Sequence, residues 1–524
     1  MHRVVIALVT LIGLTGAAFV AGYLLLFSSA TDRAAQLAPA DTAIYVNVYL
    51  QPSAAQQMNL SELIGRLPGF ADDASLDEKV DQVVQNLLSG SGIDYRENVK
   101  PWLGTQVALA AGATGDGLDG ATMVVIAQVK DREAADASIA GLLNEDGADF
   151  TLETYRGVEI ATSAEAAYAF VDDVLVIGTG AEAVHGVVDT AEGGESLADR
   201  ADFRATMADL PADHLIGAFI DVAAIATAAD IGEQVSGVST AGAALVAERD
   251  GLRLSGTAPF VMEDAAPSAR AGFAMGSEPS SLPDWMPDDT LAEVVIFGLR
   301  QTLEDAEAAL GSTPEGEELA GTLDTFRQLA AFGLGIDLDA DILPLLDREV
   351  GIAFAGMNGD VPSGQLLLRP QDPEAAADAL ERVAERLSGV GATVETVEVE
   401  GETITVVNMP DIGDIAFSIV DGIVIFGFGA DEVESAISAH ASGQNLGASA
   451  AYRGTFEVAG ARAGNEAFAD VGALIELIGE GIALPRDARD ILSQVGTFGL
   501  TAPSRDDQIE FHVVLTVNDD PGAE

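Results

Sequence analysis

The sequence predicts an α+β protein made of two tandem similar units, each with a mainly antiparallel sheet and helices, preceded by one transmembrane helix. Three observations predict this fold class: an internal duplication, the order of strands and helices in each copy, and a long uncharged run near the N-terminus. The 524 residues leave about 200 or more for each copy, enough to bury a core. The predicted segments are 1–30 (anchor), 31–262 (first unit), 263–283 (linker by composition), 284–518 (second unit) and 519–524 (tail).

The duplication is clearest in residues 167–189, AYAFVDDVLVIGTGAEAVHGVVD, which return 249 positions later as residues 416–438, AFSIVDGIVIFGFGADEVESAIS. In each copy two apolar runs flank a two-residue turn that favours a β-hairpin. A Gly-x-Gly corner follows, and apolar residues then recur at helical spacing. We therefore expect a hairpin, a corner and an amphipathic helix in both copies.

The remaining elements also recur in order. A helix start is indicated by Asp131 in the first copy and by Asp372-Pro373 in the second, because Asp caps helices and Pro suits their first turn. Alternating residues around Gly157 and Gly401 predict half-buried hairpins. The expected strands of the first copy are 43–50, 106–113, 122–129, 152–160 and 252–261, and the second copy opens on 291–299 and ends on 509–517.

The uncharged run begins at Val4 and ends at Phe27, and its 24 residues are long enough to cross a bilayer of about 30 Å. We therefore expect the lipid bilayer as a partner and a cell-membrane location. A signal anchor is favoured over a cleaved signal because a secretory apolar region has roughly 7–15 residues. Cleavage after Ser28-Ser29-Ala30 is the alternative. The usual orientation places the rest of the chain outside the cytoplasm.

The formal net charge of −59 excludes nucleic acid as an expected partner, because phosphate binding needs clustered Lys and Arg. Two interpretations of the acidity stay open: adaptation of the surface to salt, and attraction of cations. The chain has no cysteine, which excludes disulfides, thiolate metal sites and cysteine nucleophiles.

Two polar pairs recur between the copies. Asp221 and Asp470 each follow a predicted strand and precede an apolar helical run, so a helix N-cap is the default and a paired catalytic carboxylate the alternative. Arg204 and Arg453 each follow an aromatic residue on a predicted helix. Ion pairing is their default role, and anion recognition is the alternative.

Other motifs fail on spacing, so we expect no cofactor and no metal site. Gly178-Thr179-Gly180 lacks the third glycine of a dinucleotide-binding turn. The acidic run 337–341 has Ile342 where a calcium loop requires Gly. The turn 115–120 could hold a cation only weakly, and none of the histidines recurs at the equivalent position of the other copy.

The first copy carries a series of matching landmarks along most of the region after residue 30. It resembles an uncharacterised bacterial family, a domain of unknown function found behind one N-terminal membrane segment. This resemblance implies the duplicated fold but no catalytic residues, and the second copy departs from it at residues 399–402. The landmarks are Pro39, Asp41 and Thr42, then 155–158, 170–173, 175–178, Ser196-Leu197, Phe203 and Leu210-Pro211.

The expected function is therefore non-enzymatic binding or scaffolding in the cell envelope, with an envelope protein or a small ligand as the unknown partner. The alternative is an extracytoplasmic hydrolase that uses carboxylates alone, with Asp221 and Asp470 as its candidate pair. A mechanical component without a ligand is a third hypothesis.

Overall fold

The computed structural model divides the chain into two compact units, Met1–Val261 with Asp519–Glu524, and Met262–Asn518. The structure describes residues 32–51, 53–66, 78, 81, 85, 93–113, 121–146, 150–163, 166–228, 237–310, 325, 327, 328, 331, 335–359, 361–409, 413–478, 494–505 and 507–518.

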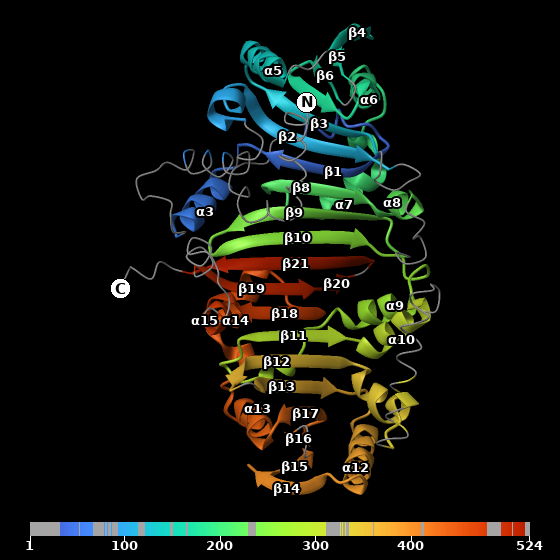
Figure 1. The fold of residues 1–524 in the computed structure, drawn as a ribbon, viewed down its shortest axis with the longest axis vertical. Helices are drawn as coiled ribbons and strands as arrows, with labels where there is room; N and C mark the ends of the chain where they lie inside the picture. Colours follow the sequence, from blue (N-terminus) through green and yellow to red (C-terminus); the bar gives the residue numbers. More distant parts are fainter. Residues whose placement is uncertain are drawn as a thin grey trace. The chain divides into compact units, whose positions relative to one another are not determined.

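In the first unit the strands pair antiparallel in the order β4-β5-β6-β7-β3-β2-β1-β8-β9-β10 (Figure 1). Its strands are β1 (Thr42–Tyr49), β2 (Leu103–Gly112), β3 (Met123–Val129), β4 (Thr151–Tyr155), β5 (Val158–Thr162), β6 (Ala167–Val171), β7 (Val174–Gly178), β8 (Ile216–Asp221), β9 (Thr240–Glu248) and β10 (Gly251–Pro259). Its helices are α3 (Ala54–Gly65), η2 (Tyr95–Val99), α5 (Arg132–Asp146), α6 (Ala181–Ala191), η3 (Leu197–Asp199), α7 (Ala201–Ala208) and α8 (Val222–Ala228).

The core of the first unit lies between its sheet and helix α6. Val124 and Ile126 of β3 and Val176 of β7 are buried against Val184 and Val187 of the helix. These two helix residues are three apart, which places them on one face of α6. The amphipathic spacing seen in the sequence therefore selects the face that packs.

In the second unit the strands pair antiparallel in the corresponding order, β14-β15-β16-β17-β13-β12-β11-β18-β19-β21, and β20 pairs with β21. Its strands are β11 (Ala292–Phe297), β12 (Glu349–Asn358), β13 (Val361–Arg369), β14 (Thr393–Val399), β15 (Glu402–Met409), β16 (Gly413–Val420), β17 (Ile423–Phe428), β18 (Asn465–Asp470), β19 (Val495–Ala502), β20 (Ser504–Arg505) and β21 (Gln508–Val517). Its helices are α9 (Pro267–Met275), η5 (Leu282–Asp284), α10 (Leu299–Leu310), η7 (Leu338–Ile342), η8 (Leu343–Leu346), α12 (Pro373–Gly389), α13 (Ala430–Ser442), η9 (Leu446–Ala448), α14 (Ala450–Ala459) and α15 (Val471–Ile478).

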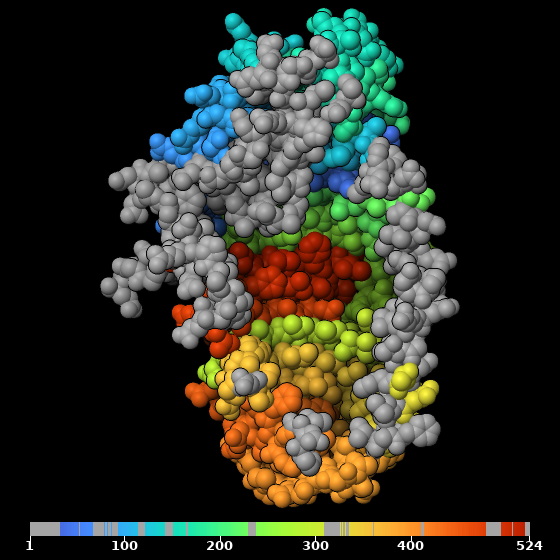
Figure 2. All heavy atoms as spheres, viewed as in Figure 1, coloured from blue at the N-terminus to red at the C-terminus, as the bar shows by residue number. Residues whose placement is uncertain are grey.

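The two faces of this sheet are covered differently. Leu367 and Ile425 point to the face that packs on α13 and α14. Val350, Leu368 and Val424 point to the opposite face, where α12 and η8 cover them. Towards β19 and β21, drawn in red in Figure 2, strand side chains are visible at the surface. Part of the second face therefore lacks a helix cover among the residues described.

The hairpins expected at 172–173 and 421–422 form, and each closes a two-residue turn, between Val171 and Val174 and between Val420 and Ile423. Asp421 and Gly422 both have positive φ, as a primed hairpin turn requires. The equivalent bridges of Pro39 to Ser196 and of Pro287 to Asn445 also recur.

The fold class expected from the sequence is wrong about the sheet. The described strands are assigned to one 21-stranded antiparallel sheet, where the duplication predicted a sheet for each copy. A sheet can add strands at its edges, so a repeated sheet-forming unit does not require separate sheets. No helix in the described ranges is long and apolar enough to cross a membrane, and the run from Val4 to Phe27 lies outside those ranges. Residues 263–283, the expected linker, contain α9 and lie within the second unit.

Candidate ligand-binding pocket

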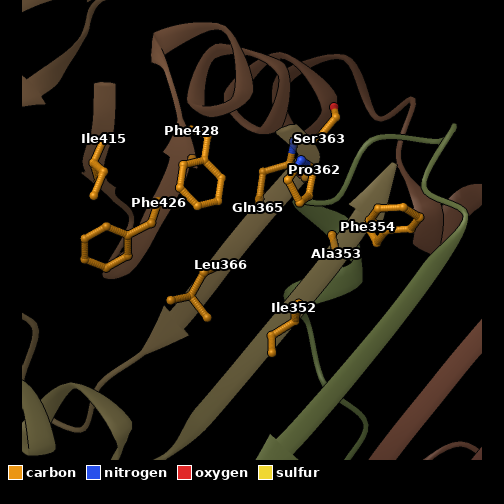
Figure 3. Close-up of a pocket in the computed structure, with 12 residues that line it drawn as sticks. Ile352, Ala353, Phe354, Pro362, Ser363, Gln365, Leu366, Ile415, Phe426 and Phe428 are labelled. Carbon is orange, nitrogen blue, oxygen red and sulfur yellow. The ribbon is translucent and has the colours of Figure 1, made fainter. Parts of the chain in front are cut away.

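A pocket of about 480 Å³ opens on the second face of the second unit's sheet. Ile352 of β12, Leu366 of β13 and Phe426 of β17 lie in one row across the strands. Figure 3 shows Phe426 and Phe428 on one side of the hollow, Phe354 on the other, and Leu366 between them. The full lining consists of Ile352, Ala353, Phe354, Pro362, Ser363, Gly364, Gln365, Leu366, Ile415, Phe426, Gly427 and Phe428.

The pocket lies on the part of an apolar sheet face that α12 and η8 do not cover. Val350 and Leu368, one row from Ile352 and Leu366, are buried beneath α12 and η8. Beyond that cover, Ile352 is 51% exposed and Phe428 is 55% exposed. Apolar side chains that remain this exposed do not contribute the free energy that burial would give. A ligand that covers them would gain this free energy on binding.

The floor of the pocket depends on a glycine. Gly364 lies opposite Phe354 at an irregularity of the β12–β13 ladder, and its φ is +151°. A Cβ at this position would overlap the carbonyl oxygen of Ala353. The bulge thus leaves a site with no side chain beside Phe354, and this helps to keep the hollow open.

Polar groups at the edge of the pocket are directed to helix α13. Ser363 donates from Oγ to Glu432 Oε1 at 2.6 Å, and Gln365 donates from Nε2 to Glu432 Oε2 at 3.0 Å. Gln365 is buried, and its Oε1 has no hydrogen-bond partner in the described part of the chain. The lining itself contains no charged residue.

The aromatic sides of the pocket belong to the second copy alone. Ala111 stands in the first copy where Phe354 stands in the second, and Thr179 stands where Phe428 stands. The duplicated backbone therefore carries a different surface in each unit.

On the opposite face of the same sheet lies a cluster of buried carboxylates. Glu293 is 1% exposed, and neither of its carboxylate oxygens has a partner among the described residues. Burial and then the neighbouring Glu466 raise the pKa of Glu293 well above its ordinary value. Glu349 is held by Arg369, whose Nη1 lies 2.9 Å from Oε1, and by Ser280 Oγ at 2.8 Å.

The predicted aspartates cap helices in their own units. Asp221 Oδ1 accepts from the backbone of Ala224 at 2.9 Å, and its Oδ2 accepts from Arg200 Nη2 at 2.6 Å. Asp470 Oδ1 accepts from the backbone of Ala473 at 2.9 Å. Each carboxylate thus satisfies amides at the start of the following helix.

The predicted arginines are also used locally. Arg204 donates from Nε to the backbone oxygen of Arg200 at 3.3 Å, and Arg453 donates to that of Ser449 at 3.4 Å. Both side chains are exposed on equivalent helices. Neither arginine lines the pocket.

The other motifs have structural partners where they are described. Asp341 is buried and ion-paired with Arg382 and Arg386. His185 lies 2.9 Å from Glu153, and His440 stacks on Trp285. The turn 115–120 lies outside the described residues. Within the ranges that the structure describes, no group of three or more His, Asp or Glu is arranged to hold a metal ion.

Sequence reasoning missed the pocket residues because alternation marks them only as half-buried strand positions. The carboxylate cluster had a visible signal, since Glu293, Glu349 and Glu466 interrupt or begin apolar strand segments. A charge at an inward strand position is uncommon and could have been noted.

Comparison with known proteins agrees with the family resemblance. Residues 4–517 match the model of the family described as "Protein of unknown function (DUF3352)". The chain belongs to this family. The comparison of this DUF3352 protein with curated proteins found no match.

Three solved structures with a match are crystal forms III, IV and I of TP0453, with 13%, 10% and 10% sequence identity. The alignments cover 43%, 43% and 44% of this chain and 79%, 79% and 80% of TP0453, each with a TM-score of 0.25. A TM-score at this level supports no conclusion about fold or function.

Proposed function

We propose that this DUF3352 protein is a non-enzymatic binding protein of the cell envelope that takes up an apolar ligand between β12, β13, β16 and β17. The observation that carries the proposal is the open apolar pocket of about 480 Å³. Ligand cavities commonly have volumes of roughly 300–1,000 Å³ and mostly apolar walls. The exposed ring of Phe428 and the half-buried ring of Phe354 supply apolar area that a ligand would cover.

The envelope location rests on the sequence. We propose that the uncharged run from Val4 to Phe27 associates with the lipid bilayer, and that the two units lie outside the cytoplasm. Protease added to intact cells stripped of their wall should digest both units. Full protection of the chain until the cells are lysed would contradict this location.

Native mass spectrometry of the full chain purified from its own membranes tests ligand binding. We expect a stoichiometric extra mass that is lost in the double variant Phe354→Ala, Phe428→Thr, which places the first copy's residues in the pocket. Met357→Thr is the matched control, because Met357 is 47% exposed on β12 but does not line the pocket. An extra mass retained by the double variant would show that the ligand binds elsewhere.

The hydrolase alternative has no comparable support. Asp221 and Asp470 belong to different units, and each is engaged with the start of its own helix. Carboxylates used in this way serve as helix caps.

A further inference from the structure

The register of the strands places a glycine between two phenylalanines of the pocket. Phe354 of β12 pairs with Gly364 of β13. On the other side of β13, Gln365 pairs with Gly427 of β17, and this register places Phe428 beside Gly364. Figure 3 shows the two rings on opposite sides of the hollow. Because Gly364 has no side chain, the pocket is a groove that follows β13 between these rings.

The width of the groove matches one hydrocarbon chain. Strands β12 and β17 flank β13, so their backbones are separated by two strand spacings, roughly 9.6 Å. Side chains perpendicular to the sheet keep about this separation. Carbon atoms in contact lie about 3.5–4.0 Å apart, so one chain between Phe354 and Phe428 needs roughly 7–8 Å and two need roughly 10–12 Å. The groove therefore admits a single chain.

The groove has one closed end and one open end. Its floor is formed by alternate residues of β13, Pro362, Gly364 and Leu366, which lie on one face of the strand. Leu366 is half buried, and Leu368, the next residue on this face, is buried beneath α12 and η8. Pro362, at the other end, is exposed.

From this geometry we infer that the pocket binds one unbranched hydrocarbon chain, whose end contacts Leu366 and whose head group leaves the groove at Pro362. The inference rests on the proposed binding function and specifies its ligand class. The floor from Pro362 to Leu366 is about 13 Å long. An extended chain with bonds of about 1.5 Å advances roughly 1.3 Å per carbon, so about ten carbons fill the groove. Leu366 thus determines the chain length that the pocket accepts.

Two isomeric alcohols test the width of the groove: n-decanol, which is unbranched, and tripropylmethanol, which is branched. Their binding to the full chain, held in an uncharged amphipathic polymer, is measured by calorimetry. Each affinity is divided by the partition coefficient of the alcohol between alkane and water, which removes the difference in hydrophobicity. We expect n-decanol to bind at one saturable site about tenfold or more tightly, because the branched isomer cannot bury all of its carbons. Equal corrected affinities would overturn the inference.

Alkyl maltosides with eight, ten, twelve and fourteen carbons test the closed end at Leu366. Their sugar head group is uncharged and large, so it remains in water beyond Pro362. Below each critical micelle concentration, the affinity should rise about three- to fourfold per carbon up to about ten carbons and then level off. A constant increase up to fourteen carbons would contradict a closed end and overturn the inference.

Substitution of Leu366 should move this limit. In Leu366→Ala we expect the fourteen-carbon maltoside to bind about tenfold more tightly than the ten-carbon one, whereas the wild type binds them about equally. Leu366→Val should move the limit by about one carbon, and it serves if the alanine variant does not fold. Leu477→Ala is the control, because Leu477 is 40% exposed on α15 and does not line the pocket. An unchanged limit in the folded Leu366 variants would show that the chain does not end at this residue, and the inference would be wrong.

The failure of the inference differs from the failure of the proposed function. Phe354→Ala with Phe428→Thr should weaken the ten-carbon maltoside roughly tenfold or more, because the variant removes apolar area that the chain covers. If this variant lowers the affinities but branched and unbranched alcohols bind the wild type equally, the pocket stands and the single-chain groove is wrong. If no maltoside binds, or the variant changes none of the affinities, both proposals are wrong.

Discussion

The hydroxyl of Tyr452 donates a hydrogen bond to Glu466 at 3.1 Å, and both side chains are buried in the second unit. Arg462 donates to the same carboxylate from Nε at 2.9 Å and from Nη2 at 3.1 Å. Burial raises the pKa of Glu466, although the bonds from Arg462 and Tyr452 lower it in part. The first copy has Phe203 and Gly217 at the positions of Tyr452 and Glu466, so this network belongs to the second copy.

Tyr452→Phe should destabilise the protein by about 1–3 kcal/mol, because it removes a donor from a buried carboxylate without changing the shape of the ring. Urea unfolding followed by circular dichroism measures this loss. Tyr168→Phe is the control, since Tyr168 is only half buried and should change the free energy of unfolding little. Equal stability of Tyr452→Phe and the wild type would show that the hydrogen bond adds nothing.

Glu293→Gln should make the protein more stable at high pH. The pKa of Glu293 is raised in the folded state, so the folded protein holds this proton more tightly than the unfolded chain does. Stability contributed by the protonated group is therefore complete below the ordinary value of 4.5 and is lost as the pH rises towards the raised pKa. Glutamine keeps the shape of the side chain but carries no charge, so the variant avoids this loss. At high pH we expect its free energy of unfolding to exceed that of the wild type by about 1–3 kcal/mol.

The measurement for Glu293 is the melting temperature as a function of pH. The difference in melting temperature between Glu293→Gln and the wild type should widen as the pH increases from about 5 to about 9. Glu395→Gln, on an exposed strand, controls for the change in net charge. Parallel pH curves for Glu293→Gln and wild type would contradict a buried proton at this carboxylate.

Gly364→Ala should destabilise the second unit by about 1–3 kcal/mol, because the residue has φ +151° and a Cβ would overlap Ala353. Gly454→Ala is the matched substitution in helix α14, where nothing lies within 4 Å of the new Cβ. This control should be stabilising by up to about 1 kcal/mol. Thermal unfolding measures both variants. If Gly364→Ala leaves the stability unchanged, the backbone of the bulge can accommodate the added Cβ.

Asp470→Ala should cost about 0.5–2 kcal/mol through the loss of the helix cap, whereas Asp470→Asn should be nearly neutral, because asparagine also caps. At Asp221 the asparagine variant should still lose stability, because the ion pair with Arg200 at 2.6 Å is removed. Urea unfolding measures both pairs. Loss of a hydrolytic activity in Asp470→Asn with unchanged stability would instead support the catalytic alternative.

Local patterns predicted several parts of the structure correctly. The turns at 172–173 and 421–422 close hairpins, and the spacing of Val184 and Val187 selects the buried face of α6. These features depend on residues close together in the chain, whose conformational preferences act before any distant contact forms. The repeat of 249 positions extended the same predictions to the second copy.

Tertiary structure decided the rest. Phe354 and Phe428 are separated by 74 positions and become two sides of one pocket because β12, β13 and β17 pair in register. The sequence by itself determined the duplication, the hairpins, the helix caps at Asp221 and Asp470 and the acidic surface, because each follows from composition or neighbouring residues. Only the tertiary structure decided which half-buried strand residues lie under a helix and which remain open, because alternation places a side chain on a face without specifying what covers that face.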